Sequence, residues 1–258
     1  MGILVIQFRI RHFQTMFSLQ FQEIIRKPII GISGLMHKTG AAKVWMRFTS
    51  ATQRFIIWRS PFMQSLKATH FIDIGANTGE FALIARAAFP LAKIISFEPQ
   101  PIAFDALNKV MKKDKNFQSY MVALGEKETK AVMYISPFSP SSSFLNKSDD
   151  AHPEEMQLQT LDHYENLITA TDTTIVKIDV EGYELSILKG AESFLKKTDW
   201  IYMECRCTET IGCSFDELYA FLLRRGWEYH GAYDSAFSTD GRLMYFDALF
   251  RNPKKIVL

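Results

Sequence analysis

Cysteine is scarce in this chain, with Cys205, Cys207 and Cys213 the only three in 258 residues. An odd and sparse set excludes the disulfide framework on which small secreted domains depend. The C-x-C-x5-C spacing is not a standard zinc pattern, and no histidine pair lies near it. We therefore expect structural thiols, no metal at the cysteines, and a reducing compartment, the cytoplasm.

Long apolar runs are also lacking. The longest uncharged run near the N-terminus, residues 12–22, is too short for a bilayer, which takes about 20 residues. The apolar residues 1–8 meet Arg9 and Arg11 at once and have no basic residues before them, which is a poor secretory signal. Ile6 breaks the myristoylation pattern that Gly2 would begin. We expect neither a membrane span nor a lipid anchor.

Acidic residues are nearly absent from the first 60 positions, where Glu23 stands against nine Lys and Arg, a balance of +8. The other 198 residues hold 21 basic and 27 acidic side chains, a balance of −6. The chain therefore divides into a basic, aromatic-rich segment over 1–60 and a second part over 61–258. Apolar spacings of three and four residues predict helices in the first part over 10–25 and 41–58.

The second part has the composition and texture of an α/β domain. Hydrophobic residues make up 47% of the whole chain, enough for a sizeable core. From residue 70, short apolar runs alternate with helical periods, which indicates βαβ units and a parallel sheet. We expect a long loop over 136–157, helices up to 88 and over 101–113, 183–196 and 214–226, and strands over 71–74, 94–98, 117–123, 131–136, 174–179, 200–204, 227–231 and 243–250.

A glycine turn follows the first of these strands, in the run Asp73-Ile74-Gly75-Ala76-Asn77-Thr78-Gly79. Glycines there allow a sharp turn onto the next helix and close approach to a ligand. Glu98 ends the second strand, where a carboxylate can accept both hydroxyl protons of a ribose. Together they indicate a nucleoside cofactor.

Two cofactors use this arrangement, and the charges separate them. The dinucleotide pattern G-x-G-x-x-G needs a glycine where this chain has Asn77, and Asp73 would repel a pyrophosphate. The same carboxylate suits a cofactor with a sulfonium and an ammonium group, S-adenosylmethionine (SAM). We favour SAM, and an NAD-dependent oxidoreductase is the alternative.

Several further runs resemble the FkbM-type SAM-dependent methyltransferases, in that family's order and over roughly residues 68–250. They are FIDIGANTGEFAL (71–83), SFEPQPIAFDAL (96–107), VALGEK (122–127), SSSF (141–144), TLDHY (160–164) and VKIDVEGYELSILKGAESFL (176–195). The resemblance implies a class I (Rossmann-like) methyltransferase fold, a mostly parallel seven-stranded sheet with one antiparallel strand and helices on both faces. It also implies O-methylation, commonly of sugar hydroxyls on glycans, glycolipids or natural products.

The same resemblance implies roles for individual residues. Asp73, Gly75, Asn77 and Gly79 match the family's motif for the methionine end of SAM, and Glu98 matches its ribose-binding acid. The segment Ala123-Leu124 matches the one expected beside the adenine.

Three acids follow the fourth and fifth strands of the predicted sheet, namely Asp179, Glu181 and Glu204. Ligands of open α/β sheets bind at the carboxyl ends of the strands, so we expect these acids beside the methyl group of SAM. Transfer to an alcohol requires removal of the hydroxyl proton, and clustered acids raise one another's pKa toward neutrality. We predict a catalytic base among them, in the order Asp179, Glu181, Glu204, with no metal. A divalent cation held by the same acids is the alternative.

The basic segment leaves three interpretations open. It covers the substrate cleft of the domain, it makes a homo-oligomer contact, or its aromatics and cations bind anionic lipid at the inner membrane surface. In the last case the protein is a membrane- or partner-docking protein with a weak or inactive methyltransferase domain. The acidic second part has no basic groove, so we expect no nucleic acid partner.

Overall fold

The computed structural model describes residues 52–135, 144–145, 151–207 and 212–255. The helix predicted over 10–25 and most of that over 41–58 lie outside the described residues, as do the interpretations of the basic segment. The described residues from Gln53 onward belong to one unit, Gln53–Leu258. No helix within the described ranges has both the length and the hydropathy to traverse a bilayer.

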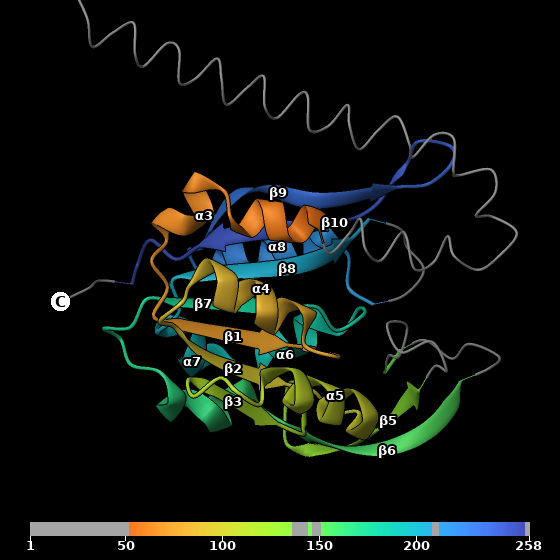
Figure 1. Cartoon of the computed structure of the whole chain (residues 1–258). Helices are drawn as coiled ribbons and strands as arrows, with labels where there is room; N and C mark the ends of the chain where they lie inside the picture. The colour runs from red at the N-terminus through yellow and green to blue at the C-terminus, as the bar shows by residue number, and fades with distance from the viewer. Residues whose placement is uncertain (1–51, 136–143, 146–150, 208–211, 256–258) are drawn as a thin grey trace, which may run out of the picture. The chain divides into compact units, whose positions relative to one another are not determined.

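A seven-stranded sheet forms the centre of this unit (Figure 1). Its spatial order is β3 (Phe117–Tyr120), β2 (Lys93–Phe97), β1 (His70–Ile74), β7 (Thr174–Ile178), β8 (Trp200–Arg206), β10 (Leu243–Arg251) and β9 (Glu228–Phe237). β10 runs antiparallel to both of its neighbours, and the pairs from β3 to β8 are parallel. The predicted mostly parallel sheet with one antiparallel strand is confirmed.

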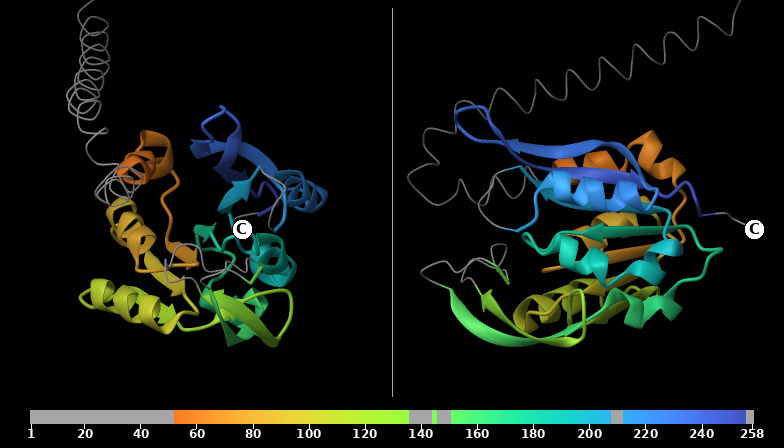
Figure 2. Two further views of the ribbon diagram at one scale, coloured as in Figure 1. Left: turned by 90° about the vertical axis from the view of Figure 1, so that its right-hand side faces the viewer. Right: turned by 180° about the vertical axis from the view of Figure 1, so that it is seen from behind.

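Helices cover both faces of the sheet (Figures 1 and 2). α3 (Pro61–Ser65), α4 (Glu80–Ala88) and α5 (Pro101–Met111) lie on one side, and α6 (Glu184–Lys189), α7 (Glu192–Lys196) and α8 (Phe215–Arg224) lie on the other. Local signals set their starts. Proline opens α5, and Ser214 and Glu217 form a capping box at α8. The 3-10 helix η2 (Leu161–Leu167) is capped by Thr160.

Three expected elements differ from the structure. The strand predicted over 117–123 is split, because β3 ends at Tyr120 and β4 (Ala123–Leu124) pairs in a second sheet. That sheet has the order β4-β6-β5, and its strands β5 (Thr129–Ile135) and β6 (His152–Gln159) are antiparallel. The loop predicted over 136–157 is therefore wrong from residue 152. β6 escaped recognition because only Met156 and Leu158 of its side chains are buried.

The third difference is the helix predicted over 183–196, which is broken into α6 and α7 at Gly190. A Cβ atom on Gly190 would lie 2.0 Å from the Gly125 carbonyl oxygen, so the two chain segments pass each other where only glycine fits. Asp162 accepts hydrogen bonds from the Ser193 and Phe194 amides and so caps α7 from η2.

Trp58 ties the residues before α3 to this core. Residues 52–58 are helical, and the Trp58 side chain is completely buried. Its ring meets those of Phe71, Phe81, Phe89 and Tyr202 edge-on, with centroids 4.9–6.3 Å apart. The packed core thus begins before residue 61.

We expect Trp58→Ala to lower the free energy of unfolding by about 3–5 kcal/mol, because it leaves a cavity among four rings. The control is Phe55→Ala on the same helical stretch, where the side chain is 44% exposed and the loss should stay under about 1 kcal/mol. Urea unfolding measures both, and equal losses would show that the indole does not belong to the core.

Candidate active site

The parallel register of β1, β7 and β8 brings the predicted site residues to one edge. Ile74 pairs with Ile178, and Ile178 pairs with Met203. The next residue on each segment is therefore Gly75, Asp179 and Glu204, side by side where the parallel pairing of the three strands ends, although β8 itself runs on to Arg206.

The glycine turn has the left-handed backbone that its sequence requires. Gly75, Asn77 and Gly79 have φ angles of 73°, 47° and 94°. A Cβ atom on Gly75 would lie 2.0 Å from the backbone oxygen of Asp179. The close approach of the turn to the backbone after β7 therefore requires glycine at position 75, whether or not a ligand binds there.

Glu98 is 3% exposed and holds the turn from the β2 side. One carboxylate oxygen accepts a hydrogen bond from the Asn77 amide at 2.8 Å, and the other accepts from the Gln100 amide at 2.9 Å. Burial raises the pKa of Glu98, and these two amides oppose the shift. Each carboxylate oxygen keeps a second lone pair that can accept a hydrogen bond from a ribose hydroxyl. Ribose binding by Glu98 stays a prediction.

Asp73 is completely buried and forms an ion pair with Lys177, whose Nζ lies 3.1 Å from one carboxylate oxygen. The two residues are direct partners in the β1–β7 register. Burial raises the pKa of Asp73, and Lys177 opposes that shift. The contact between Asp73 and the methionine end of SAM stays a prediction, and the structure gives this carboxylate a protein cation as its partner.

Ala123 and Leu124 form β4, which pairs with the end of β6. Both side chains are buried, and Leu124 joins the main core cluster while Ala123 joins a small cluster under the second sheet. Their place beside the adenine stays a prediction.

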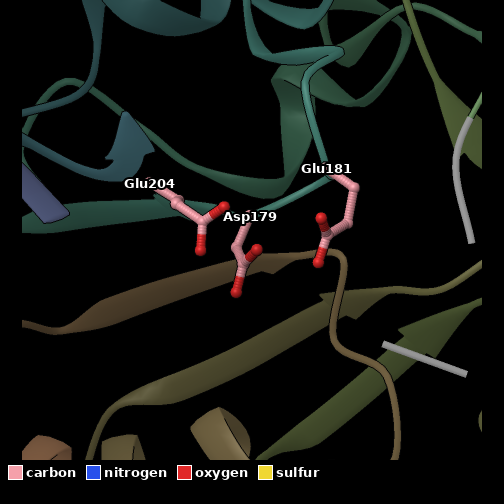
Figure 3. Close-up of side chains that lie close together, drawn as sticks. All are labelled: Asp179, Glu181 and Glu204. Carbon is pink, nitrogen blue, oxygen red and sulfur yellow. The ribbon is translucent and has the colours of Figure 1, made fainter. Parts of the chain in front are cut away.

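Asp179, Glu181 and Glu204 come together as the sequence predicts, each offering a carboxylate oxygen within 4.8 Å of the others. Figure 3 shows Asp179 between the other two, with all three carboxylates turned toward the same space. Arg206 forms an ion pair with Glu181, and its Nε lies 3.6 Å from Glu204.

The three acids differ in electrostatics. Burial raises the pKa of Glu204 to about 9, reinforced by the charges of Asp179, Glu181 and Asp247. Burial and Asp179 raise the pKa of Glu181 to about 7, against the attraction of Arg206. The side chain of Asp179 is 26% exposed and that of Glu204 only 10%. At neutral pH Glu204 therefore holds its proton.

Sequence reasoning missed several charged residues that build this edge. Asp247 lies opposite Glu204 in the β8–β10 ladder, accepts a hydrogen bond from the Tyr202 hydroxyl at 2.7 Å, and has a pKa raised to about 7, mainly by burial. Glu184 accepts hydrogen bonds from the Val180 and Gly182 amides and so shapes the loop of Glu181. For Asp247, the sequence signal was a single acid within an otherwise apolar strand.

The model of the methyltransferase FkbM domain matches residues 73–229, more than half of the chain. The chain belongs to the FkbM methyltransferase family. The oxidoreductase alternative is thereby removed.

Curated relatives in other organisms are also methyltransferases. Methyltransferase 1 of Beauveria bassiana is 23% identical over 143 residues, which are 47% of this chain and 57% of that protein. Hexuronic acid methyltransferase AglP of Haloferax volcanii is 29% identical over 136 residues, 51% of this chain and 54% of that protein. The chain therefore spans little more than half the length of these relatives.

The solved structure of methyltransferase FkbM from Methylobacillus flagellatus KT has the same fold. It matches with a TM-score of 0.50 at 18% identity, covering 76% of this chain and 47% of that chain. This likeness and the strand order confirm the class I methyltransferase fold.

SAM is the cofactor of the FkbM family, and the donor set at the carboxyl edge fits it. Carboxyl groups outnumber cations there, which suits a sulfonium and an ammonium and disfavours a pyrophosphate. Asp179, Glu181 and Glu204 also have a spacing that a divalent cation can use, but the Arg206 guanidinium already pairs with Glu181. The negative charge of Glu181 is therefore balanced by Arg206.

Gly75→Ala should destabilise the fold by roughly 2–5 kcal/mol, since it adds a left-handed alanine and a contact with the Asp179 carbonyl. Gly241→Ala is the matched control, because its φ is 83° and nothing lies within 4 Å of its Cβ position. It should cost only about 1–2 kcal/mol. Equal losses in denaturant unfolding would contradict the close approach at Gly75.

Glu204→Gln should flatten the pH dependence of stability. Between pH 4.5 and about 9 the unfolded state releases the Glu204 proton while the folded state keeps it, so stability falls as pH rises. Removing this group should take away up to about 1.4 kcal/mol per pH unit of that slope.

Urea unfolding between pH 5.5 and 8.5 measures the slope, with Glu126→Gln as control because the Glu126 side chain is 57% exposed. Identical slopes for wild type and Glu204→Gln would show that the folded protein does not retain this proton.

Proposed function

We propose that this protein is a SAM-dependent O-methyltransferase whose acceptor is a hydroxyl on a sugar of a glycan, glycolipid or related natural product. The observation that supports it best is the juxtaposition of the Asp179–Glu181–Glu204 cluster with the glycine turn. The name of the Haloferax relative, a hexuronic acid methyltransferase, favours a carbohydrate acceptor.

The glycine turn and Glu98 would hold the cofactor at the carboxyl ends of β1 and β2. SAM supplies a methyl group on a positively charged sulfur. Glu98 would accept hydrogen bonds from ribose hydroxyls, and the backbone of the turn would contact the methionine part.

Asp179 is the best candidate for the base that takes the hydroxyl proton. It is the central carboxylate of the cluster, its side chain is 26% exposed, and the Lys177 ammonium attracts it from 3.7 Å. In methyl transfer from SAM to a hydroxyl, Asp179 would accept the hydroxyl proton and later pass it to solvent.

The other two acids of the cluster are less suited to removing the hydroxyl proton. Glu181 is held by Arg206, and Glu204 keeps its own proton at neutral pH. A protonated Glu204 can donate a hydrogen bond to the acceptor or to Asp179 instead of removing a proton. The roles within the cluster thus follow from burial and partners.

Methyl transfer from labelled SAM to a panel of hexuronic acid oligosaccharides, neutral glycans and glycolipids tests the function on the full chain. Asp179→Asn should lower turnover about 10²- to 10⁴-fold while SAM affinity by calorimetry changes little. Asp216→Asn, an exposed aspartate in the first turn of α8, is the control and should leave both unchanged.

Each contrary outcome points elsewhere. A wild-type chain that binds no SAM overturns the proposed function. Full turnover by Asp179→Asn overturns the base assignment. Loss of turnover with a chelator and recovery with Mg²⁺ supports the metal alternative for the same three acids.

A further inference from the structure

Lys177 carries more contacts than its charge requires. Its residue is 2% exposed, and a buried ammonium needs a counter-ion, which Asp73 provides at 3.1 Å. The same Nζ also donates hydrogen bonds to the backbone oxygens of Gly75 at 3.0 Å and Ile74 at 3.3 Å. One cation therefore joins the end of β1, the glycine turn and β7.

The surroundings of Lys177 fix the ammonium in this place. The register sets Lys177 beside Asp73 on the sheet face that α4 covers, and the Phe81 ring of α4 lies 4.8 Å from Nζ. Arg54 lies over the same ring at 5.5 Å, so a second cation discourages movement in that direction. The ammonium points along the strand toward the carboxyl edge, where Asp179 lies 3.7 Å away.

If Lys177 served only to neutralise Asp73, its hydrogen bonds to the Ile74 and Gly75 carbonyl oxygens would have no explanation. The Gly75 oxygen belongs to the turn whose backbone is expected to meet the cofactor. The backbone amides of Gly75, Ala76 and Asn77 are bonded to the Phe97 oxygen and the Glu98 carboxylate, whereas Lys177 bonds carbonyl oxygens of this segment. A donor on two successive carbonyls of this segment limits the orientations that its peptide planes can adopt.

We propose that Lys177 is a positioning residue for the cofactor turn, and that Asp73 serves the cofactor site through Lys177 as its counter-ion. This inference rests on the proposed function, because it needs SAM to bind at the turn. It differs from the reading in which the Asp73 carboxylate itself contacts the cofactor.

A double-mutant cycle on the full chain separates the two readings. The variants are Asp73→Asn, Lys177→Met and Lys177→Met/Asp73→Asn, with Lys189→Met on α6, 45% exposed, as control. Lys177→Met alone leaves Asp73 buried without its cation and should unfold at lower temperature. The double variant removes both charges, so its unfolding temperature should recover toward that of Asp73→Asn.

SAM titration by calorimetry is the deciding measurement. If Lys177 positions the turn, the double variant binds SAM about tenfold more weakly than Asp73→Asn, since two hydrogen bonds to the turn are lost. Lys177→Gln/Asp73→Asn restores a neutral donor and should recover part of that loss. If Lys177 had only a structural role, the variants would differ in unfolding temperature but not in this order of SAM affinities.

Equal SAM affinities for Asp73→Asn and both double variants overturn the inference. If Lys177→Met/Asp73→Asn does not fold, the glutamine double variant is compared with Asp73→Asn, and equal affinity again overturns it. A wild-type chain without SAM affinity overturns the proposed function as well, so the two failures are distinguishable.

Discussion

The pairing of β1 with β7 is the constraint on which the site depends. Both strands are buried, and their register places Asp73 against Lys177 and Gly75 against the backbone of Asp179. A slip by one residue would turn Lys177 to the opposite face and bring a side chain against the Asp179 carbonyl. The same pairing that builds the sheet thus also sets the distance between the cofactor turn and the candidate base.

Charge is distributed at this edge in two layers. Below the surface, the charges of Asp73 and Lys177 offset each other in a buried ion pair. Nearer the surface, Asp179, Glu181 and Glu204 face the open side with Arg206 as their partner. A cationic cofactor would offset the excess of acid there, and burial favours the protonated form of Glu204.

The sequence could predict what depends on local pattern. The strand, glycine turn and helix around Asp73 follow from apolar periodicity and glycine spacing, and the meeting of Asp179 with Glu204 follows from the rule that parallel strands end together. The partners of these residues could not be predicted in the same way. Lys177 is a charged residue within an otherwise apolar buried strand, and its sequence context gives no partner for it. Only the register shows that Asp73 lies opposite it. β6 is largely exposed and charged, so its pairing with β5 leaves little trace in its own residues.

The packing of Trp58 has a mechanical consequence. Its indole packs against Phe81, and the Phe81 ring also contacts the ammonium of Lys177 that bonds the glycine turn. Close-packed side chains transmit displacement because they have no free volume into which to relax. The point at which the chain enters the domain and the turn expected to hold the cofactor are therefore linked by a single row of three side chains, Trp58, Phe81 and Lys177. The family match begins at Asp73, but the packed core that supports the site begins with the helical residues before α3, where Trp58 is buried.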